Sequence, residues 1–408
     1  MISECRSCGS ERVERVFSLG PAPLANRLSD DERAARSEPR YPLDLYLCAD
    51  CGLAQLGEAP PPGEIFADYP YLSSFSDTMV EHARELAQTL IAELSLDGSA
   101  PVVEVGSNDG YLLQHFARAG VPTLGVDPAE AACELAAERG IETRQLFFGE
   151  AVAEELAGEG ISPRLVVANN VMAHVPDVND VVAGARRLLA PDGTFVIETP
   201  YLRDLIERLE FDTIYHEHLF YYSLTSLTAL LARHGLGRID VARFPIHGGS
   251  LRVIARAGSG SSAAAEELLG EEDDWGVREL RPYAEFSSRV DERRRDLRDL
   301  LMARSREGRR IAAYGAAAKG VMLLNALDLD VDVLDFVVDR NPRKQGRRLP
   351  GSGLEIRPPE DLLAEMPDDV LLLAWNVGDE VIAQQSEYRR RGGTFIVPLP
   401  ELRKVGPP

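Results

Sequence analysis

Two kinds of hydrophobic pattern alternate along the middle of the chain. Short runs of β-branched and other apolar residues, such as PVVEVG at 101–106 and GTFVIET at 193–199, are separated by alanine-rich stretches with helical spacing. Strands that alternate with helices in this way are typical of a parallel sheet with crossover helices. The pattern therefore predicts a doubly wound α/β domain. An amphipathic helix is expected before it, over residues 76–95, with Ser76 or Asp77 as its cap.

The pattern changes after Thr199. An aromatic and histidine-rich stretch, FDTIYHEHLFYYSLTSL at 211–227, precedes FPIHGGSLRVIARAG at 244–258, which predicts further sheet. Residues 259–275 are small, polar and acidic, so we expect a solvated linker or loop there, followed by a charged helix. From Arg310 a second alternation of strands and helices begins. The chain thus predicts two Rossmann-like units, with a boundary near the acidic stretch.

Four of the five cysteines stand in two CxxC pairs near the N-terminus. Cys5 and Cys8 lie in CRSCGS, and Cys48 and Cys51 lie in CADCGL. Two tight turns that each offer two thiolates make a tetrahedral zinc site with no position left for water, so we predict a structural zinc in a zinc-ribbon lobe. A redox dithiol is the alternative, but it would need only one such pair beside a βαβ unit. We expect Cys133 to be a small buried side chain in a helix.

Length and charge narrow the class of protein. A chain of 408 residues is too long for one ordinary core, which agrees with two large domains and a small lobe. There are 66 acidic and 44 basic residues, and the resulting charge of -22 would repel a phosphate backbone, so no nucleic acid partner is expected. No apolar run approaches a membrane span, and the first residues lack the apolar core of a signal peptide. We expect a cytoplasmic monomer with no membrane partner.

A glycine loop follows the first strand of the α/β pattern, in EVGSNDG at 104–110. Glycine lets the backbone approach a ligand closely, and the helix that begins there offers free N–H groups. Asp127 ends the next strand about 20 residues on, where a carboxylate can bind both hydroxyls of a ribose. The NAD fingerprint needs a second glycine for its pyrophosphate, which this loop lacks, so an adenosine without phosphates fits better. A strand, turn and helix that bind nothing remain the alternative.

These features predict a site for S-adenosylmethionine. We expect Glu104 to face the positive amino end of the methionine half and Asn169, at the end of a later strand, to complete the pocket. The candidate cofactor residues are Glu104, Gly106, Ser107, Asn108, Asp127 and Asn169.

The chain carries, in this order, the motifs CRSCG, CADCGLAQL, YPYLSSFSDT, EVGSNDGYLLQHF, NNVMAHVPD, DTIYHEHLFYYS, HGGSLRV, AYGAAAKG and VVDRNPRKQGRRLPG. Over nearly its whole length it resembles the deoxysugar C-methyltransferases, whose members methylate TDP-linked 4-ketohexoses on the way to antibiotic sugars. The resemblance implies a zinc lobe over residues 1–70, a central S-adenosylmethionine-binding methyltransferase domain over 71–258, and a C-terminal Rossmann-like domain over 259–408 that holds the nucleotide sugar.

The resemblance also implies that an enolate beside a ketone receives the methyl group, which requires a base for the α-proton. Histidine has a suitable intrinsic pKa, and a neighbouring carboxylate can orient it. By resemblance, His218 is the candidate base, and Tyr215 and Glu217 position it or the sugar. His174 would face the same crevice and donate a hydrogen bond to the developing oxyanion.

Two further sets of residues follow from the resemblance. The family has a tyrosine over the reaction centre, and we favour Tyr69 over Tyr71 in ADYPYLSS. In the C-terminal domain, YGAAAKG at 314–320 opens a helix whose start would suit the diphosphate of a sugar nucleotide, and Asp339 ends the next strand, where a Rossmann half holds a ribose. A Rossmann half without a ligand is the alternative. The candidate substrate residues are Tyr314, Lys319, Asp339 and Arg340.

The predicted function is S-adenosylmethionine-dependent C-methylation of a TDP-4-keto-deoxyhexose, with C3 as the expected position. Carbon C5 also lies beside the ketone and is the nearest alternative. An NAD-dependent oxidoreductase and a non-catalytic zinc-ribbon scaffold are more distant alternatives, and the first lacks a Tyr-x-x-x-Lys pair near the crevice. An O- or N-methyltransferase would not need a base able to deprotonate carbon.

Overall fold

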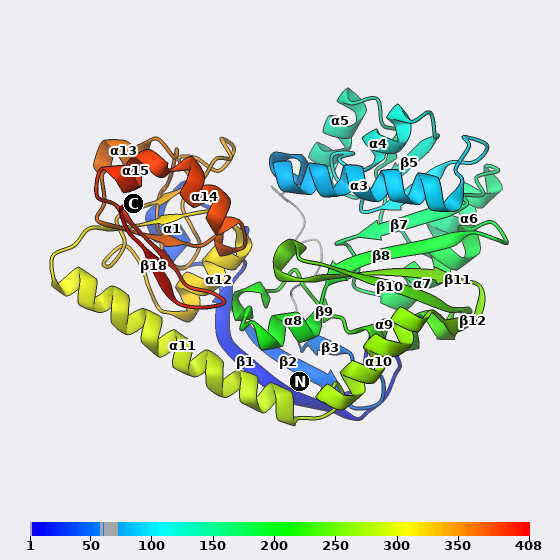
Figure 1. The fold of residues 1–408 in the computed structure, drawn as a ribbon, viewed down its shortest axis with the longest axis horizontal. Helices are drawn as coiled ribbons and strands as arrows, with labels where there is room; N and C mark the ends of the chain where they lie inside the picture. The colour runs from blue at the N-terminus through cyan, green and yellow to red at the C-terminus, as the bar shows by residue number, and fades with distance from the viewer. Residues whose placement is uncertain (1, 58–59, 61–71) are drawn as a thin grey trace.

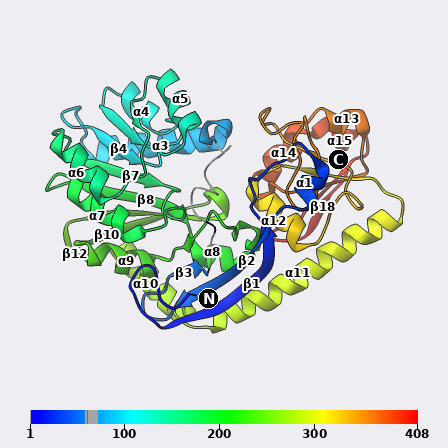
Figure 2. The ribbon, with the colours of Figure 1, turned by 180° about the vertical axis from the view of Figure 1, so that it is seen from behind.

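The central and C-terminal α/β domains form two lobes, which the N-terminal sheet and a long helix join at their lower side (Figure 1). The computed structural model describes residues 2–57, 60 and 72–408. The long helix α11 (Arg281–Arg306) runs along the underside of the C-terminal lobe to the middle of the molecule, where it meets strands β1 (Val13–Pro23) and β2 (Arg40–Cys48), which continue toward the underside of the central domain (Figure 1 and Figure 2). No helix in this described part of the chain is long and apolar enough to cross a membrane.

The N-terminal sheet is completed by a strand from the middle of the chain. Strands β1, β2 and β3 (Ala54–Leu56) pair antiparallel, and β3 pairs in turn with β9 (Phe220–Tyr221). The backbone N–H of Leu56 also donates to the carbonyl of Leu219 at 2.9 Å. A short helix, α1 (Glu32–Arg36), lies between β1 and β2 in the chain. The histidine-rich stretch is therefore continuous with the sheet of the cysteine lobe.

The central sheet confirms the α/β prediction. Its order is β12-β10-β11-β8-β7-β4-β5-β6, in which β4 to β8 run parallel and β11 runs antiparallel to β8. Helix α3 begins where expected, because the Ser76 hydroxyl accepts from the N–H of Met79. The strands are β4 (Val102–Val105), β5 (Thr123–Val126), β6 (Thr143–Arg144), β7 (Leu165–Asn169), β8 (Thr194–Pro200), β10 (Leu236–Phe244), β11 (Ser250–Arg256) and β12 (Gly258–Ser261). The helices are α3 (Asp77–Leu94), α4 (Leu113–Arg118), α5 (Glu130–Glu138), α6 (Glu150–Gly158), α7 (Val178–Leu188), α8 (Leu202–Glu207) and α9 (Leu224–Arg233), with single turns η1 (Ser73–Phe75), η2 (Phe211–Thr213) and η3 (Ile246–Gly248).

The expected linker over residues 259–275 is wrong. This stretch forms the end of β12 and helix α10 (Ala263–Trp275). The helix buries Ala265, Leu268 and Glu272, which lie on one face at helical spacing. The carboxylate of Glu272 accepts from the N–H groups of Leu224 and Thr225 at 2.7 Å each, so it satisfies the start of α9. The sequence pattern predicted that Glu272 is exposed to solvent, because its two hydrogen-bond partners lie 48 and 47 residues earlier and no local pattern reveals them.

The C-terminal domain is a second α/β unit, as predicted. Its sheet has the order β15-β14-β13-β16-β17-β18, parallel except for the edge strand β18. The strands are β13 (Ile311–Tyr314), β14 (Val337–Val338), β15 (Ile356–Arg357), β16 (Asp369–Leu372), β17 (Thr394–Val397) and β18 (Arg403–Val405). The helices are α12 (Ala318–Ala326), α13 (Asp361–Glu365), α14 (Gly378–Gln384) and α15 (Ser386–Arg390), with one turn η4 (Trp375–Val377).

The N-terminal segment holds the two lobes together. Phe17 of β1 packs its ring against Phe286 of α11, with centroids 4.9 Å apart. Ser29 forms an isolated bridge with Arg348, so the segment also reaches the loops of the C-terminal sheet. A single hydrophobic core therefore runs from the N-terminal sheet into the C-terminal domain.

Candidate functional site

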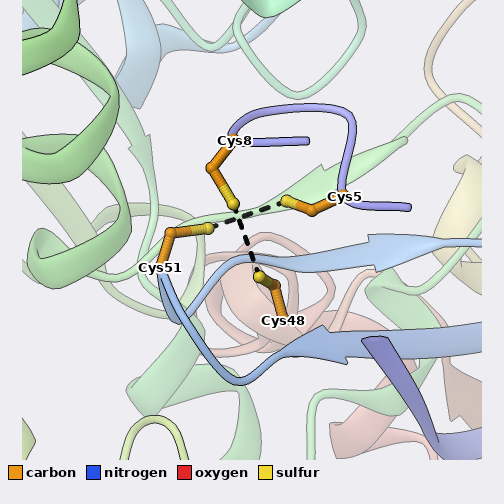
Figure 3. A group of neighbouring side chains, drawn as sticks. All are labelled: Cys5, Cys8, Cys48 and Cys51. Carbon is orange, nitrogen blue, oxygen red and sulfur yellow. Dashed lines mark hydrogen bonds between the residues drawn. The ribbon is translucent and has the colours of Figure 1, made fainter. Parts of the chain in front are cut away.

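The four cysteines of the CxxC pairs converge on one point (Figure 3). Their sulfur atoms all lie within 4.8 Å of one another, with Cys5 and Cys51 3.7 Å apart and Cys8 and Cys48 3.6 Å apart. Tetrahedral zinc with Zn–S bonds of about 2.3 Å needs sulfur atoms about 3.8 Å apart. The four residues therefore fit a closed zinc site, and the predicted structural zinc is confirmed.

The zinc lobe also packs against the back of the central domain. The Asn179 amide on α7 donates to the carbonyls of Arg6 and Ser7, at 3.1 and 3.0 Å, and Arg233 of α9 donates to the Ser7 carbonyl and hydroxyl. These contacts fix the first metal-binding turn to two helices of the central domain. The metal site thereby stabilises more than its own lobe.

Cys133 has a different environment from the one expected. Its side chain is half-buried and its thiol donates to the carbonyl of Asp127 at 3.3 Å. It lies outside the metal-binding group.

The glycine loop folds around Asp127. Gly106 and Gly110 have φ values of 66° and 75°, and Asn108 has 49°, so the loop makes three left-handed steps that glycine and asparagine tolerate best. The N–H of Asn108 donates to Asp127 Oδ2 at 2.8 Å, and the N–H of Ala129 donates to Oδ1 at 2.9 Å. Asp127 thus lies at the carboxyl end of β5 beside the loop, at the edge of the sheet where ligands of such folds bind.

Buried acids surround this loop. Glu104 is fully buried and neither of its carboxylate oxygens has a partner among the described residues; Oδ1 of the buried Asp109 and Asn169 likewise have none. Burial raises the pKa of Glu104 well above its usual range, and the charges of Asp127 and Asp109 raise it further. A positively charged ligand would relieve this repulsion. The residues fit the positively charged amino and sulfonium groups of S-adenosylmethionine, and Asp127 stays the predicted ribose ligand.

The aromatic and histidine-rich stretch places Tyr215 and His218 together. The Tyr215 hydroxyl lies 2.8 Å from His218 Nε2, and His218 Nδ1 lies 3.1 Å from the carbonyl of Thr213. A carbonyl can only accept, so Nδ1 carries the proton and the lone pair of the neutral ring is on Nε2, where the Tyr215 hydroxyl donates to it. His218 therefore has the tautomer of a base that acts through Nε2.

His174 lies against His218, with ring centroids 4.8 Å apart. Burial lowers the pKa of His174 to about 4, although a hydrogen bond to the backbone of Glu217 opposes this shift. The ring is therefore neutral at pH 7 and carries a single N–H. Donation by His174 to the developing oxyanion stays a prediction.

Glu217 faces the N-terminal segment. Its two oxygens accept from the Asn26 amide nitrogen at 2.8 and 2.9 Å, and Lys344 of the C-terminal domain is a cation that faces it. His216 is also directed toward the N-terminal segment, since its Nε2 lies 3.1 Å from the carbonyl of Tyr41. Among the described residues no hydrogen bond joins the Glu217 carboxylate to His218, and a role of Glu217 in positioning the base stays a prediction.

Replacing Glu217 by glutamine is expected to change how stability depends on pH. Burial raises the pKa of Glu217 from 4.5 to about 7, opposed by Asn26 and Lys344. A raised pKa means that the folded state holds the proton more tightly, so stability is lost as pH rises from the unfolded pKa through the folded one. As pH rises from about 4.5 to 7, the free energy of unfolding of the wild type should fall relative to that of Glu217→Gln by on the order of 3 kcal/mol. Its melting temperature should fall with it.

Thermal unfolding across this pH range checks the expectation. Glu266→Gln on the exposed face of α10 is the matched control, because it makes the same chemical change at a solvated position. Parallel melting curves for the wild type and Glu217→Gln would contradict the argument.

The second glycine loop brings three of the four candidate substrate residues together. Asp339 accepts from the N–H of Ala316 at 2.7 Å and from that of Asn341 at 2.8 Å, so it lies beside the loop that follows Tyr314. Arg340 is near both Tyr314 and Glu380. This arrangement parallels that of Asp127 in the central domain.

Lys319 is directed elsewhere. Its amino group donates to Asn376 Oδ1 at 2.6 Å and lies 4.7 Å from the centre of the Trp375 ring. The carboxylates of Asp212 and Glu210, which belong to the central domain, are the charges that face it. Lys319 therefore contributes to the contact between domains.

The sequence prediction did not include several residues of this region. Asn26, Asp212, Lys344 and Trp375 all touch or face the predicted site residues but were not among the candidates. Asp212 and Lys344 lie inside two of the family motifs, whereas Asn26 and Trp375 lie outside all of them, so no local signal marked the latter two. The predicted Tyr69 and its alternative Tyr71 lie outside the described residues.

Three regions of the chain match known families. Residues 5–66 match a zinc binding domain, residues 79–239 match a methyltransferase domain, and residues 245–400 match the C-methyltransferase C-terminal domain. The three matches follow the three parts of the fold.

Whole-chain similarity points the same way. The chain is 40% identical over 407 residues to the C-methyltransferase NovU of Streptomyces niveus, covering 99% of this chain and 97% of NovU. It is 36% identical over 118 residues to a ubiquinone biosynthesis O-methyltransferase of Methylococcus capsulatus, which covers 28% of this chain and 48% of that protein. Among solved structures, the PH0226 protein of Pyrococcus horikoshii covers 48% of this chain and 99% of its own, with 17% identity and a TM-score of 0.36. The chain therefore belongs to the C-methyltransferase family that includes NovU, and it is an S-adenosylmethionine-dependent C-methyltransferase with a structural zinc.

Proposed function

We propose that the protein methylates a carbon beside the ketone of a TDP-linked 4-keto-deoxyhexose, with C3 as the expected position, in the biosynthesis of an antibiotic deoxysugar. The observation that carries the proposal is the geometry of His218. Its Nδ1–H is held by the Thr213 carbonyl and its Nε2 accepts from Tyr215, as a base for a carbon acid requires. Transfer to oxygen or nitrogen would not need such a base.

The chemistry is proton abstraction followed by carbon–carbon bond formation. His218 Nε2 takes the α-proton, and the electrons of the broken C–H bond move toward the ketone oxygen to give an enolate. The Tyr215 hydroxyl, already beside Nε2, is the donor that can turn to the enolate oxygen once the ring is protonated. His174, whose ring lies against that of His218, is a second candidate donor to the enolate oxygen. Bound S-adenosylmethionine supplies an electrophilic methyl group on its sulfonium.

The two glycine loops divide the recognition of the ligands between them. In the central domain, taken as residues 71–258, the buried acids around Asp127 hold the positively charged cofactor. In the C-terminal domain, taken as residues 259–408, Asp339 and Arg340 bind the ribose and phosphates of the nucleotide beside Tyr314. Two separate loops of one kind in one chain support a reaction with two nucleoside-containing ligands.

The test is a reaction of the purified protein with S-adenosylmethionine and a TDP-4-keto-deoxyhexose in deuterated water. We expect the gain of one methyl group per sugar and, without the cofactor, exchange of the α-proton for deuterium. Proton spectra of the product then place the methyl group at C3 or C5. Methylation at an oxygen, or no reaction with any 4-keto sugar nucleotide, would overturn the proposal.

A further inference from the structure

A buried hydrogen bond joins the C-terminal domain to the segment that precedes His218. Trp375 Nε1 of η4 donates to Asp212 Oδ2 of η2 at 2.7 Å. Asp212 is fully buried and Trp375 is 7% exposed. The second oxygen of Asp212, Oδ1, has no partner among the residues that the structure describes. Trp375 is thus the side-chain donor that holds this carboxylate, beside the backbone N–H groups of Asp212 and Thr213.

Lys319 strengthens the same contact. Its amino group lies 4.7 Å from the centre of the Trp375 ring, and its charge attracts the Asp212 carboxylate. Lys319 is in the first turn of α12, directly after the loop whose Ala316 N–H is bound by Asp339. The helix that opens at the second glycine loop therefore reaches the central domain through Asp212.

Asp212 is one residue away from the group that orients His218. Thr213 follows it in the single turn η2, and the Thr213 carbonyl accepts from His218 Nδ1 at 3.1 Å. Because η2 is a single turn of three residues, a movement of the Asp212 backbone also rotates the peptide unit that carries the Thr213 carbonyl. The position of the Asp212 carboxylate thus sets the direction of the carbonyl that selects the tautomer of His218.

We propose that Trp375 and Asp212 are positioning residues, through which the C-terminal domain aligns the Thr213 carbonyl with His218 and so completes the catalytic base. That this alignment completes a catalytic base rests on the proposed function, whereas the alignment of the Thr213 carbonyl with His218 does not. A carboxylate buried with so few donors is strongly affected when one is lost, because the desolvated charge is then uncompensated. Burial raises the pKa of Asp212 to about 6, and Lys319 and the Trp375 hydrogen bond oppose that rise.

The experiment removes the donor and keeps the ring. Trp375→Phe preserves an aromatic side chain beneath Lys319 but lacks Nε1–H. The matched control is Trp275→Phe, at the only other tryptophan of the chain, whose ring packs near Tyr283 in α11. Asp212→Asn keeps an oxygen acceptor for Trp375 but loses the attraction to Lys319, so it should retain more of the exchange rate than Asp212→Ala, which should behave like Trp375→Phe.

Two readouts separate positioning from mere stability. The first is the rate of α-proton exchange in deuterated water, where Trp375→Phe should lower kcat about tenfold with KM for the sugar nucleotide unchanged. The second is the ¹⁵N NMR spectrum of the His218 ring, whose signals are assigned by their loss in His218→Asn. This spectrum should show Nδ1–H in the wild type and a mixture of the two tautomers in Trp375→Phe.

The outcomes distinguish the two proposals. Equal exchange rates and the same ring spectrum in Trp375→Phe and the wild type would overturn the inference, as would equal losses in Trp375→Phe and Trp275→Phe. If the wild type exchanges no α-proton from any 4-keto sugar nucleotide, the proposed function fails. The ring spectrum then decides by itself whether Trp375 sets the tautomer.

Discussion

Replacing His218 by asparagine is expected to lower the rate of methyl transfer roughly a thousandfold, the usual contribution of a positioned general base. The physical reason is that Nε2 is the nitrogen of this ring with a lone pair, because Nδ1 donates to the Thr213 carbonyl. Asparagine can keep a hydrogen bond to that carbonyl but cannot take a proton from carbon at neutral pH. The measurement is product formation together with α-proton exchange, and both should fall by the same factor.

The affinity for S-adenosylmethionine is the internal control for His218→Asn. Glu104 lies in β4 and Asp127 directly follows β5, and no hydrogen bond among the described residues joins either of them to His218. Calorimetric binding of the cofactor should therefore be unchanged. His115→Asn, on α4, makes the same chemical change on another element and should keep full activity. Normal α-proton exchange in His218→Asn would assign the base to another residue.

Removal of the zinc is expected to abolish methyl transfer and to lower the melting temperature by roughly 10 °C, since structural zinc contributes several kcal/mol or more to folding. The loss of activity follows from the sheet. Cys48 ends β2, β2 pairs with β3, and β3 pairs with β9, which begins two residues after His218. Loss of the metal therefore loosens the strand that anchors the candidate base.

The measurement is chelation followed by metal analysis, thermal unfolding and methyl transfer. One zinc per chain should be released, and activity should return when zinc is added back. Cys48→Ser should behave like the chelated protein, whereas Cys133→Ser, outside the metal-binding group, should keep both zinc and activity. Full activity in a chelated, zinc-free protein would show that the lobe does not support the candidate base.

Local patterns predicted most of the elements and the metal site. The runs of β-branched residues in β4, β7 and β8 each bury side chains on both faces of a parallel sheet, which makes them readable from the sequence alone. The cap of α3 depends on Ser76 and a backbone N–H three residues later, so it is equally local. The cysteine pairs were informative for a similar reason, because each CxxC turn carries two ligands by itself.

The acidic helix α10 shows where local patterns fail. Its buried face includes Glu272, an acid whose burial depends on two N–H groups of another helix. From composition alone, this acidic stretch was predicted to be a solvent-exposed linker. The same difficulty applies to Lys319, which the loop motif associated with a diphosphate and which the fold directs toward Asp212 and Trp375.

By itself, the sequence determined the α/β class, the two glycine loops with their strand-end acids, and the four zinc ligands, because each depends on residues within a turn or on a repeating period. Only the tertiary structure decided what surrounds His218. Asn26 reaches Glu217 across 191 positions of the chain, and Trp375 reaches Asp212 across 163. Contacts of that range depend on how three sheets pack around a shared segment, and no period, cap or turn in the sequence encodes that packing.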